Sequence, residues 1–122
     1  MEGDMETRAR RMKMAREMMA QGLRQTVPTA DVIVTNPTHF AVALKYDAAT
    51  MDAPRVVAKG ADYAAFRIRE LAAAHGVPII EKPPLARALY AGADVGRAIS
   101  PQFYEAVAEV LAYVYRLKGK AA

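Results

Sequence analysis

Two apolar segments separated by only four residues place the strongest constraint on how this chain folds. The first covers residues 31–35 and the second covers residues 40–46, and both are rich in the β-branched and aromatic side chains that favour buried strands. Residues 36–39 between them include Pro37, which has no N–H to donate to a sheet ladder. The pattern therefore predicts a tight connection between two strands of one sheet.

The rest of the chain alternates between strand and helix signals. Residues 55–59 predict a third strand, and residues 62–74 predict a helix that Asp62 could cap. Residues 77–81 predict a fourth strand. Strand, helix and strand at this spacing predict a parallel pair with a right-handed crossover, and thus an α/β fold. Two further helices are expected, one over residues 83–90 and one that begins at Ser100-Pro101.

Residues 1–26 differ from the rest and predict a basic amphipathic helix. Lys and Arg interleave there with Asp and Glu, and apolar residues recur at three- and four-residue steps. Two interpretations stay open, a linker helix and an arm that contacts a membrane surface or a nucleic acid. We therefore divide the chain into a linker helix, 1–26, and one domain, 27–122. The expected apolar face comprises Met5, Ala9, Met12, Ala15, Met19 and Leu23.

Composition excludes several classes of site. The 122-residue chain has no Cys and two His, and Ser100 is the one Ser. A thiolate metal site, a Cys nucleophile and a disulfide are therefore impossible, and a zinc site or a serine triad has almost nothing to draw on. No apolar run approaches the roughly 18 residues of a membrane helix. We expect no cofactor and no metal, and the net charge of +4 is only a weak indication of an anionic partner.

The Asn36-Pro37 dipeptide has its own reactivity. An Asn side-chain amide can attack its own backbone carbonyl, close a succinimide and expel the next residue as an amine. The competing deamidation needs the backbone N–H of the following residue, which Pro37 lacks. If this site reacts, the chain is cut between Asn36 and Pro37. An isolated Asn-Pro is nevertheless usually an ordinary turn.

Five stretches of this sequence resemble the self-cleaving cytoplasmic domain of the FlhB/YscU family of flagellar and type III secretion export proteins. The first stretch contains Val-Ile-Val-Thr-Asn-Pro-Thr-His-Phe-Ala-Val-Ala-Leu-Lys-Tyr, which is closer to the flagellar branch. Together the five cover nearly the whole chain. They are residues 32–46, 52–60, 75–81, 83–90 and 104–112.

This resemblance implies a fold and a function. The fold would be a small mixed four-stranded sheet surrounded by helices. The function would be single-turnover self-cleavage at Asn36–Pro37, without enzymatic turnover, that switches export from the rod and hook class to the filament class. Implied partners are export-gate proteins, rod and hook substrates and the hook-length control protein, with no nucleic acid. Family members also carry an N-terminal membrane domain, so we expect the cytoplasmic part of an inner-membrane protein.

The resemblance also implies site residues. Asn36 would be nucleophile and attacked carbonyl, Pro37 the leaving group, and Thr38 a support for the turn. His39 would either supply a proton or orient the loop. A small apolar patch for export substrates would comprise Ala53, Pro54, Ala108 and Leu111, although the last two could simply be core residues.

The alternatives to the export-switch function are a membrane-free relative that acts as a binding domain and a basic nucleic-acid-binding module.

Overall fold

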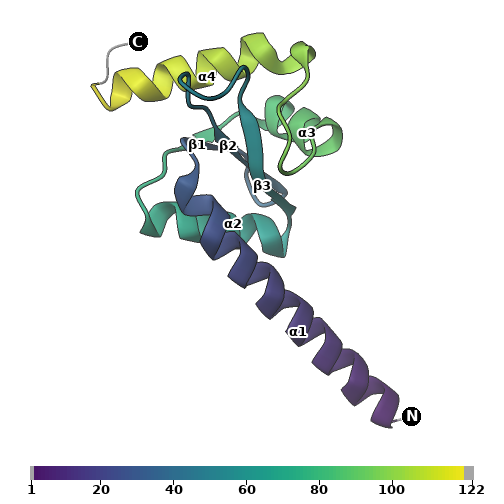
Figure 1. The fold of residues 1–122 in the computed structure, drawn as a ribbon. Helices are drawn as coiled ribbons and strands as arrows, with labels where there is room; N and C mark the ends of the chain where they lie inside the picture. Colours follow the sequence, from purple (N-terminus) through teal and green to yellow (C-terminus); the bar gives the residue numbers. More distant parts are fainter. Residues whose placement is uncertain (1, 120–122) are drawn as a thin grey trace.

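Four strands form one mixed sheet in the computed structural model, which describes residues 2–119 (Figure 1). The order across the sheet is β3-β2-β1-β4. The apolar segments predicted as strands all form strands, with ends that differ by one or two residues. Their bounds are β1 Val32–Asn36, β2 Phe40–Lys45, β3 Arg55–Ala61 and β4 Ile79–Glu81.

The four-residue connection joins two adjacent strands, as the spacing predicted. β1 and β2 pair antiparallel from Val32 opposite Leu44 to Asn36 opposite Phe40. β3 pairs antiparallel with the other side of β2, and β4 pairs parallel with β1. The predicted pairing of the third and fourth strands is therefore wrong: they run in the same direction, but β2 and β1 lie between them.

Helices cover both faces of this sheet (Figure 1). α2 packs on one face of the sheet, and α3 and α4 cover the opposite face. The short β4 follows α2 in the chain. The mixed sheet surrounded by helices is thus confirmed. The helical elements are α1 Glu2–Thr26, η1 Val27–Thr29, α2 Tyr63–Ala74, α3 Pro83–Gly92, η2 Pro101–Phe103 and α4 Tyr104–Leu117.

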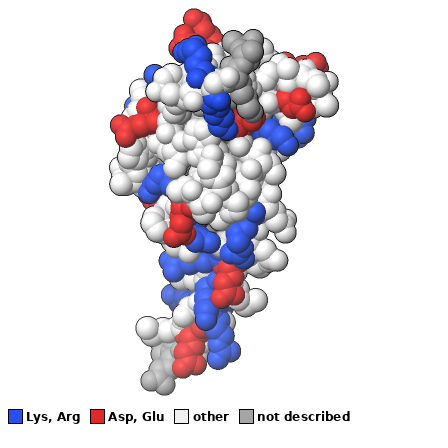
Figure 2. Space-filling model, turned by 90° about the vertical axis from the view of Figure 1, so that its left-hand side faces the viewer, with Lys and Arg blue, Asp and Glu red and all other residues white. Residues whose placement is uncertain are grey.

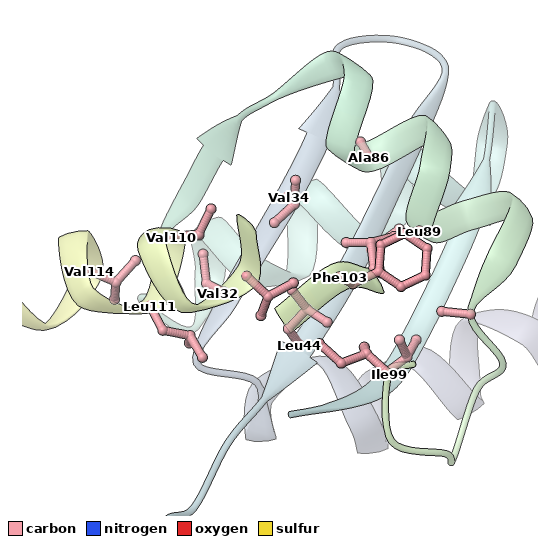
Figure 3. Packing of buried hydrophobic residues seen from close by; sticks show 14 residues of the cluster. Val32, Val34, Leu44, Ala86, Leu89, Ile99, Phe103, Val110, Leu111 and Val114 are labelled. Atoms are coloured by element: carbon pink, nitrogen blue, oxygen red, sulfur yellow. The ribbon is translucent and has the colours of Figure 1, made fainter. Parts of the chain in front are cut away.

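Alternate residues of the central strands fill two separate cores. Val32 and Val34 of β1 contact α3 and α4, and Figure 3 shows them facing side chains such as Val110 and Leu89. Ile33, between them in sequence, instead joins the cluster on the α2 face. A strand buried on both faces reads as a continuous apolar run, which is why residues 32–34 are all apolar. α4 turns one face to the core: Val107, Val110, Leu111 and Val114 are buried, as is Phe103 just before the helix.

Most of α1 extends away from the sheet, and only its last turns pack against the domain (Figure 1). Met5 and Met12 of the predicted apolar face are 71% and 58% exposed, whereas Ala20 and Leu23 are buried. Figure 2 shows the Lys and Arg side chains of α1 alternating with acidic ones. The final turns of α1 therefore contribute to the core cluster on the α2 face of the sheet.

Two predicted helix starts differ from the structure. Asp62 stands at the start of α2, but its side chain makes no capping hydrogen bond, and its backbone adopts a positive φ of 51°. Ser100 also makes no side-chain cap, because Pro101 opens the 3₁₀ turn η2 and the α-helix begins only at Tyr104. Gly76, just after the end of α2, has a φ of 70° that glycine adopts without strain.

Candidate functional site

Residues 36–39 form a β-turn that projects from the end of the β1–β2 hairpin. Asn36 is the last residue of β1, and Pro37, Thr38 and His39 are exposed. The His39 N–H donates a hydrogen bond of 3.0 Å to the Asn36 carbonyl oxygen. Proline at the second position and a positive φ at the third are the features of a type II turn. The turn therefore presents the Asn36–Pro37 bond at the surface while β1 stays anchored in the sheet.

Thr38 occupies the turn position that normally requires glycine. Its φ is 70°, which is unfavourable for a β-branched residue. A backbone held in such a region costs on the order of 1–3 kcal/mol and persists only where the surroundings enforce it. Pairing of Asn36 with Phe40 on one side of the turn provides that enforcement.

Asp62 supports the turn from the neighbouring strand connection, a role that sequence analysis missed. Its N–H donates a hydrogen bond of 2.9 Å to the His39 carbonyl oxygen, and its own φ of 51° is also positive. The two residues with positive φ, Thr38 and Asp62, are thus connected through His39, which follows Thr38 in the chain and accepts the hydrogen bond from Asp62. An Asp before a helix suggests a cap in the sequence, and no local pattern indicates that its backbone reaches the turn instead.

The hydrogen bond within the turn falls on the atom that cyclisation would charge. Attack by the Asn36 side-chain nitrogen on the Asn36 carbonyl carbon would place negative charge on the carbonyl oxygen. The His39 N–H already donates to that oxygen at 3.0 Å. A backbone donor aimed at a developing oxyanion typically stabilises it, and removal of one such donor from an enzyme's oxyanion hole costs about 10²–10³ in rate.

The His39 ring lies on the exposed side of the turn near aromatic neighbours. Its centroid is 6.5 Å from that of Phe40, whose ring stacks on Tyr90 at 4.6 Å. Lys59 donates to the carbonyl oxygens of Tyr90 and Ala93 at 2.9 and 2.8 Å, which holds the end of α3 beside these rings. The start of β2 at Phe40 is therefore firmly packed, while the residues just before it are exposed.

The four residues of the predicted apolar patch lie together. Ala53 and Pro54, just before β3, and Ala108 and Leu111 of α4 line one cavity of about 350 Å³. Ala108 is exposed, whereas Leu111 and Ala53 also belong to the buried set, so the patch is continuous with the core. Asp52, Ala112 and three tyrosines that sequence analysis did not select complete the lining: Tyr46, Tyr104 and Tyr115.

Tyr115 lines this cavity, and its pKa is shifted. Burial raises the pKa of its hydroxyl above the ordinary value of 10.0, and the charges of Asp31, Tyr46 and Asp47 raise it further. Asp31 also accepts a 2.7 Å hydrogen bond from the Tyr46 N–H, which fixes the end of β2 at the rim. The cavity therefore keeps a neutral phenol beside an apolar surface at ordinary pH.

Neither a metal site nor a membrane span is found in the part of the chain that the structure describes. Residues 2–119 contain no group of three or more His, Cys, Asp or Glu side chains placed to hold a metal ion. Within the same range, no helix has the length and apolarity required to cross a bilayer.

The sequence is similar to curated flagellar proteins. Flagellar biosynthetic protein FlhB of Salmonella typhimurium is 55% identical over 117 residues, which are 96% of this chain and 30% of that protein. The FlhB of Bacillus subtilis is 49% identical over 119 residues, or 98% of this chain and 33% of that protein. The chain thus spans about a third of the length of these relatives.

The fold is similar to solved structures of matching domains. The cytoplasmic domain of FlhB from Shewanella putrefaciens is 46% identical, with a TM-score of 0.77 over 81% of this chain and 76% of that one. A mutated EscU C-terminal domain is 36% identical, with a TM-score of 0.73 over 75% and 92% of the two chains. A family model for the FlhB HrpN YscU SpaS family matches residues 1–114. This chain therefore belongs to the FlhB HrpN YscU SpaS family.

Proposed function

We propose that this chain is the cytoplasmic part of a flagellar export-gate protein and that it cuts its own Asn36–Pro37 bond to change which substrates are exported. One observation carries the proposal: the Asn36–Pro37 bond lies in an exposed turn whose Asn36 carbonyl oxygen already accepts the His39 N–H. Membership in the family supports the export role. Cleavage is a single event per chain and not catalytic turnover.

The reaction balances without water or cofactor. The Asn36 side-chain nitrogen attacks the Asn36 carbonyl carbon and loses one proton. The bond from that carbon to the Pro37 nitrogen then breaks, and the Pro37 nitrogen gains one proton and leaves as a secondary amine. Residue 36 becomes a succinimide, which water later opens. An amide nitrogen is a weak nucleophile, so the fixed turn geometry must supply much of the acceleration, up to roughly 7–11 kcal/mol in favourable cases.

His39 has two possible roles that a pH–rate profile separates. Imidazole ordinarily titrates near neutral pH and could deliver the proton to Pro37. If the side chain is the donor, the cleavage rate depends on pH, and His39→Ala removes that dependence. If the side chain only orients the turn, His39→Ala changes the rate by the same factor at every pH. The backbone N–H of residue 39 is present in both proteins, so its contribution cancels.

Once the Asn36–Pro37 bond is cut, the turn would no longer hold Thr38 at its positive φ. We infer that this release changes the surface offered to export substrates and to the hook-length control protein. Rod and hook substrates would dock in the cavity formed by Ala53, Pro54, Ala108 and Leu111. Its apolar floor and tyrosine rim suit an apolar or aromatic side chain from an export signal.

The mass of the purified, denatured protein tests cleavage. Wild type should give two fragments that meet at Asn36 and Pro37, and Asn36→Ala should give one mass with an unchanged fold. Pro37→Ala should slow the cut or divert it to deamidation, because the new backbone N–H opens that competing route. Asn36→Ala that is still cut at this bond would contradict cyclisation.

Export switching is tested in a flagellated bacterium. The corresponding part of the Salmonella typhimurium relative would be replaced by this chain, either wild type or Asn36→Ala. Wild type should support secretion of both hook and filament proteins, and Asn36→Ala should retain hook secretion and lose filament secretion. Equal filament secretion by wild type and Asn36→Ala would show that switching does not require cleavage, which would contradict the proposal.

A further inference from the structure

The two edge strands of the sheet, β3 and β4, differ in how their outer backbone groups are hydrogen-bonded. At the β3 edge, Val56 exchanges two backbone hydrogen bonds with the 96–97 segment, of 3.1 Å to Arg97 and 2.7 Å from Gly96. Ile99 adds a bond of 2.9 Å to Pro54 just before β3. At the other edge, β4 has β1 as its one neighbouring strand within residues 2–119. Exposed strand edges are ready templates for another chain, and proteins usually cover them.

The register shows which backbone groups of β4 face outward. The Ile33 N–H donates to Pro78 at 2.8 Å, and the Lys82 N–H donates to Thr35 at 3.0 Å. In a parallel ladder with this register, Ile80 directs its N–H and C=O toward β1. The N–H and C=O of Ile79 and Glu81, one residue to either side, therefore point away from the sheet. These two residues present the spacing that an added strand needs.

A groove runs beside this edge. It has a volume of about 590 Å³ and lies between β4, the start of α3 and α4. Val110, which Figure 3 shows on α4 beside the sheet, forms part of the lining. Ile79 and Tyr113 at its margins are 40% and 46% exposed. A strand that added to β4 would place alternate side chains on the Ile80 face, over the apolar floor made by Ile80, Leu85, Ala106 and Val110.

The charge of the groove is opposite to that of the chain. The whole sequence carries a net charge of +4, yet the groove is lined by Glu81 and Glu109 against one cation, Lys82. Both glutamates are exposed, so they are available to an incoming cation. An occupant with Lys or Arg beside its apolar residues would be favoured over an acidic one.

We propose that the outer edge of β4 and this groove form a strand-addition site for an extended basic peptide segment of a partner protein. The segment pairs its backbone with Ile79 and Glu81, inserts an apolar side chain beside Ile80, and directs flanking Lys or Arg toward Glu109 and Glu81. This site is separate from the cavity at Ala53 and Leu111 and does not depend on cleavage of the turn.

A pair of labelled peptides tests the backbone pairing. The first is fluorescein-Thr-Lys-Val-Ile-Val-Lys-Thr-amide, and the second has the same side chains with its central amides N-methylated. Binding to the whole chain is followed by fluorescence anisotropy at low salt, and the site is mapped by amide hydrogen exchange. The first peptide should bind saturably and slow exchange of the Ile79 and Glu81 amides, and the N-methylated peptide should not bind.

Three variants locate the site. Ile79→Pro removes an outward N–H without removing a bond to β1, and should weaken binding about fivefold or more, on the order of one hydrogen bond. Glu109→Lys should weaken it by a similar factor that shrinks at high salt. Val95→Lys changes an exposed apolar residue outside the groove lining and should bind as wild type does. Circular dichroism and thermal unfolding check that each variant is folded.

Several outcomes would overturn the proposal. These are the absence of saturable binding, equal binding of the N-methylated peptide, or protection at the cavity near Leu111 with none at Ile79 and Glu81. Equal affinity of wild type and Glu109→Lys for the peptide would contradict the charge argument and the orientation of the basic residues. Because Glu109 lies on α4 and makes no bond within the sheet, its substitution leaves strand pairing intact and keeps this result interpretable.

Discussion

At the scale of single residues, Thr38 links the strain of the turn to the bond beside it. The side chain is β-branched, the φ is 70°, and the residue follows the Pro37 that would leave on cleavage. Glycine would adopt this conformation at little cost. Thr38 therefore holds strain in the intact turn, and a cut at Asn36–Pro37 would release it.

Thr38→Gly should stabilise the intact chain. Measured in an Asn36→Ala background, so that every molecule is whole, the free energy of unfolding should rise by about 1 kcal/mol, because relief of the strain exceeds the added entropy of an unfolded glycine. Urea unfolding measures the change. Thr50→Gly, in an exposed turn without positive φ, is the matched control and should be slightly destabilising. If both substitutions destabilise equally, Thr38 is not strained.

Tyr115 predicts a pH dependence at the alkaline end. Its pKa is raised in the folded state, so the unfolded chain loses the phenolic proton first as pH rises. The unfolded state then binds fewer protons than the folded one, and the free energy of unfolding falls as pH passes above about 10. Tyr115→Phe should make this fall shallower, as urea unfolding at a series of pH values would show. Tyr113→Phe on the exposed side of α4 is the control and should leave the slope unchanged.

At the scale of elements, the close approach of β3 and α2 determines how the strand leads into the helix. A Cβ built on Gly60 would overlap the Cβ of Ala64, in the first turn of α2. Only a residue without a side chain fits there. This contact places Asp62 in a short connection with a positive φ, from which its N–H reaches the His39 carbonyl. The packing of α2 on β3 thus positions a support for the turn.

Gly60→Ala should therefore be destabilising. Overpacking between Gly60 and Ala64 typically costs about 1–3 kcal/mol, and urea unfolding measures it. Gly22→Ala is the matched control, because nothing lies within 4 Å of a Cβ built there and the residue lies inside α1. That control should raise the free energy of unfolding by roughly 0.5–1 kcal/mol through helix propensity. A neutral Gly60→Ala would mean that α2 can move without cost.

At the scale of the whole molecule, the proposed cut would produce a short fragment, residues 1–36, that contains β1. This strand pairs with β2 on one side and β4 on the other, and its side chains enter both cores. Residues 1–36 would therefore remain bound to residues 37–122 after cleavage. The loss would be local to the turn, while the sheet and its helices persist.

The two fragments should co-elute in size-exclusion chromatography. Cleaved wild type and intact Asn36→Ala are expected at the same elution volume in native buffer, because fully buried Val32, Ile33 and Val34 hold β1 in place. In denaturing urea the wild type should separate into two species and Asn36→Ala should remain one. Separation of the fragments in native buffer would show that pairing of β1 alone cannot hold them.

The local sequence was sufficient to predict those features that depend on interactions between residues close together in the chain. The run of apolar residues at 32–34 and the four-residue connection after it correctly predicted a buried strand and a tight turn. The Asp62 cap was wrong because the turn and Gly60 constrain that backbone more than capping does. The predicted pairing of the third and fourth strands was wrong because a strand–helix–strand pattern does not specify which strands are neighbours in the sheet.

By itself, then, the sequence determined the secondary structure of most segments, the family, and the Asn36-Pro37 pair whose chemistry depends on two neighbouring side chains. Only the tertiary structure decided that β4 pairs with β1, that Asp62 supports the turn, and that Tyr46, Tyr104 and Tyr115 line the cavity at the predicted apolar patch. The physical reason is range. Strand and helix propensities act over a few residues, whereas these contacts join segments that only packing of the complete sheet and its helices brings together.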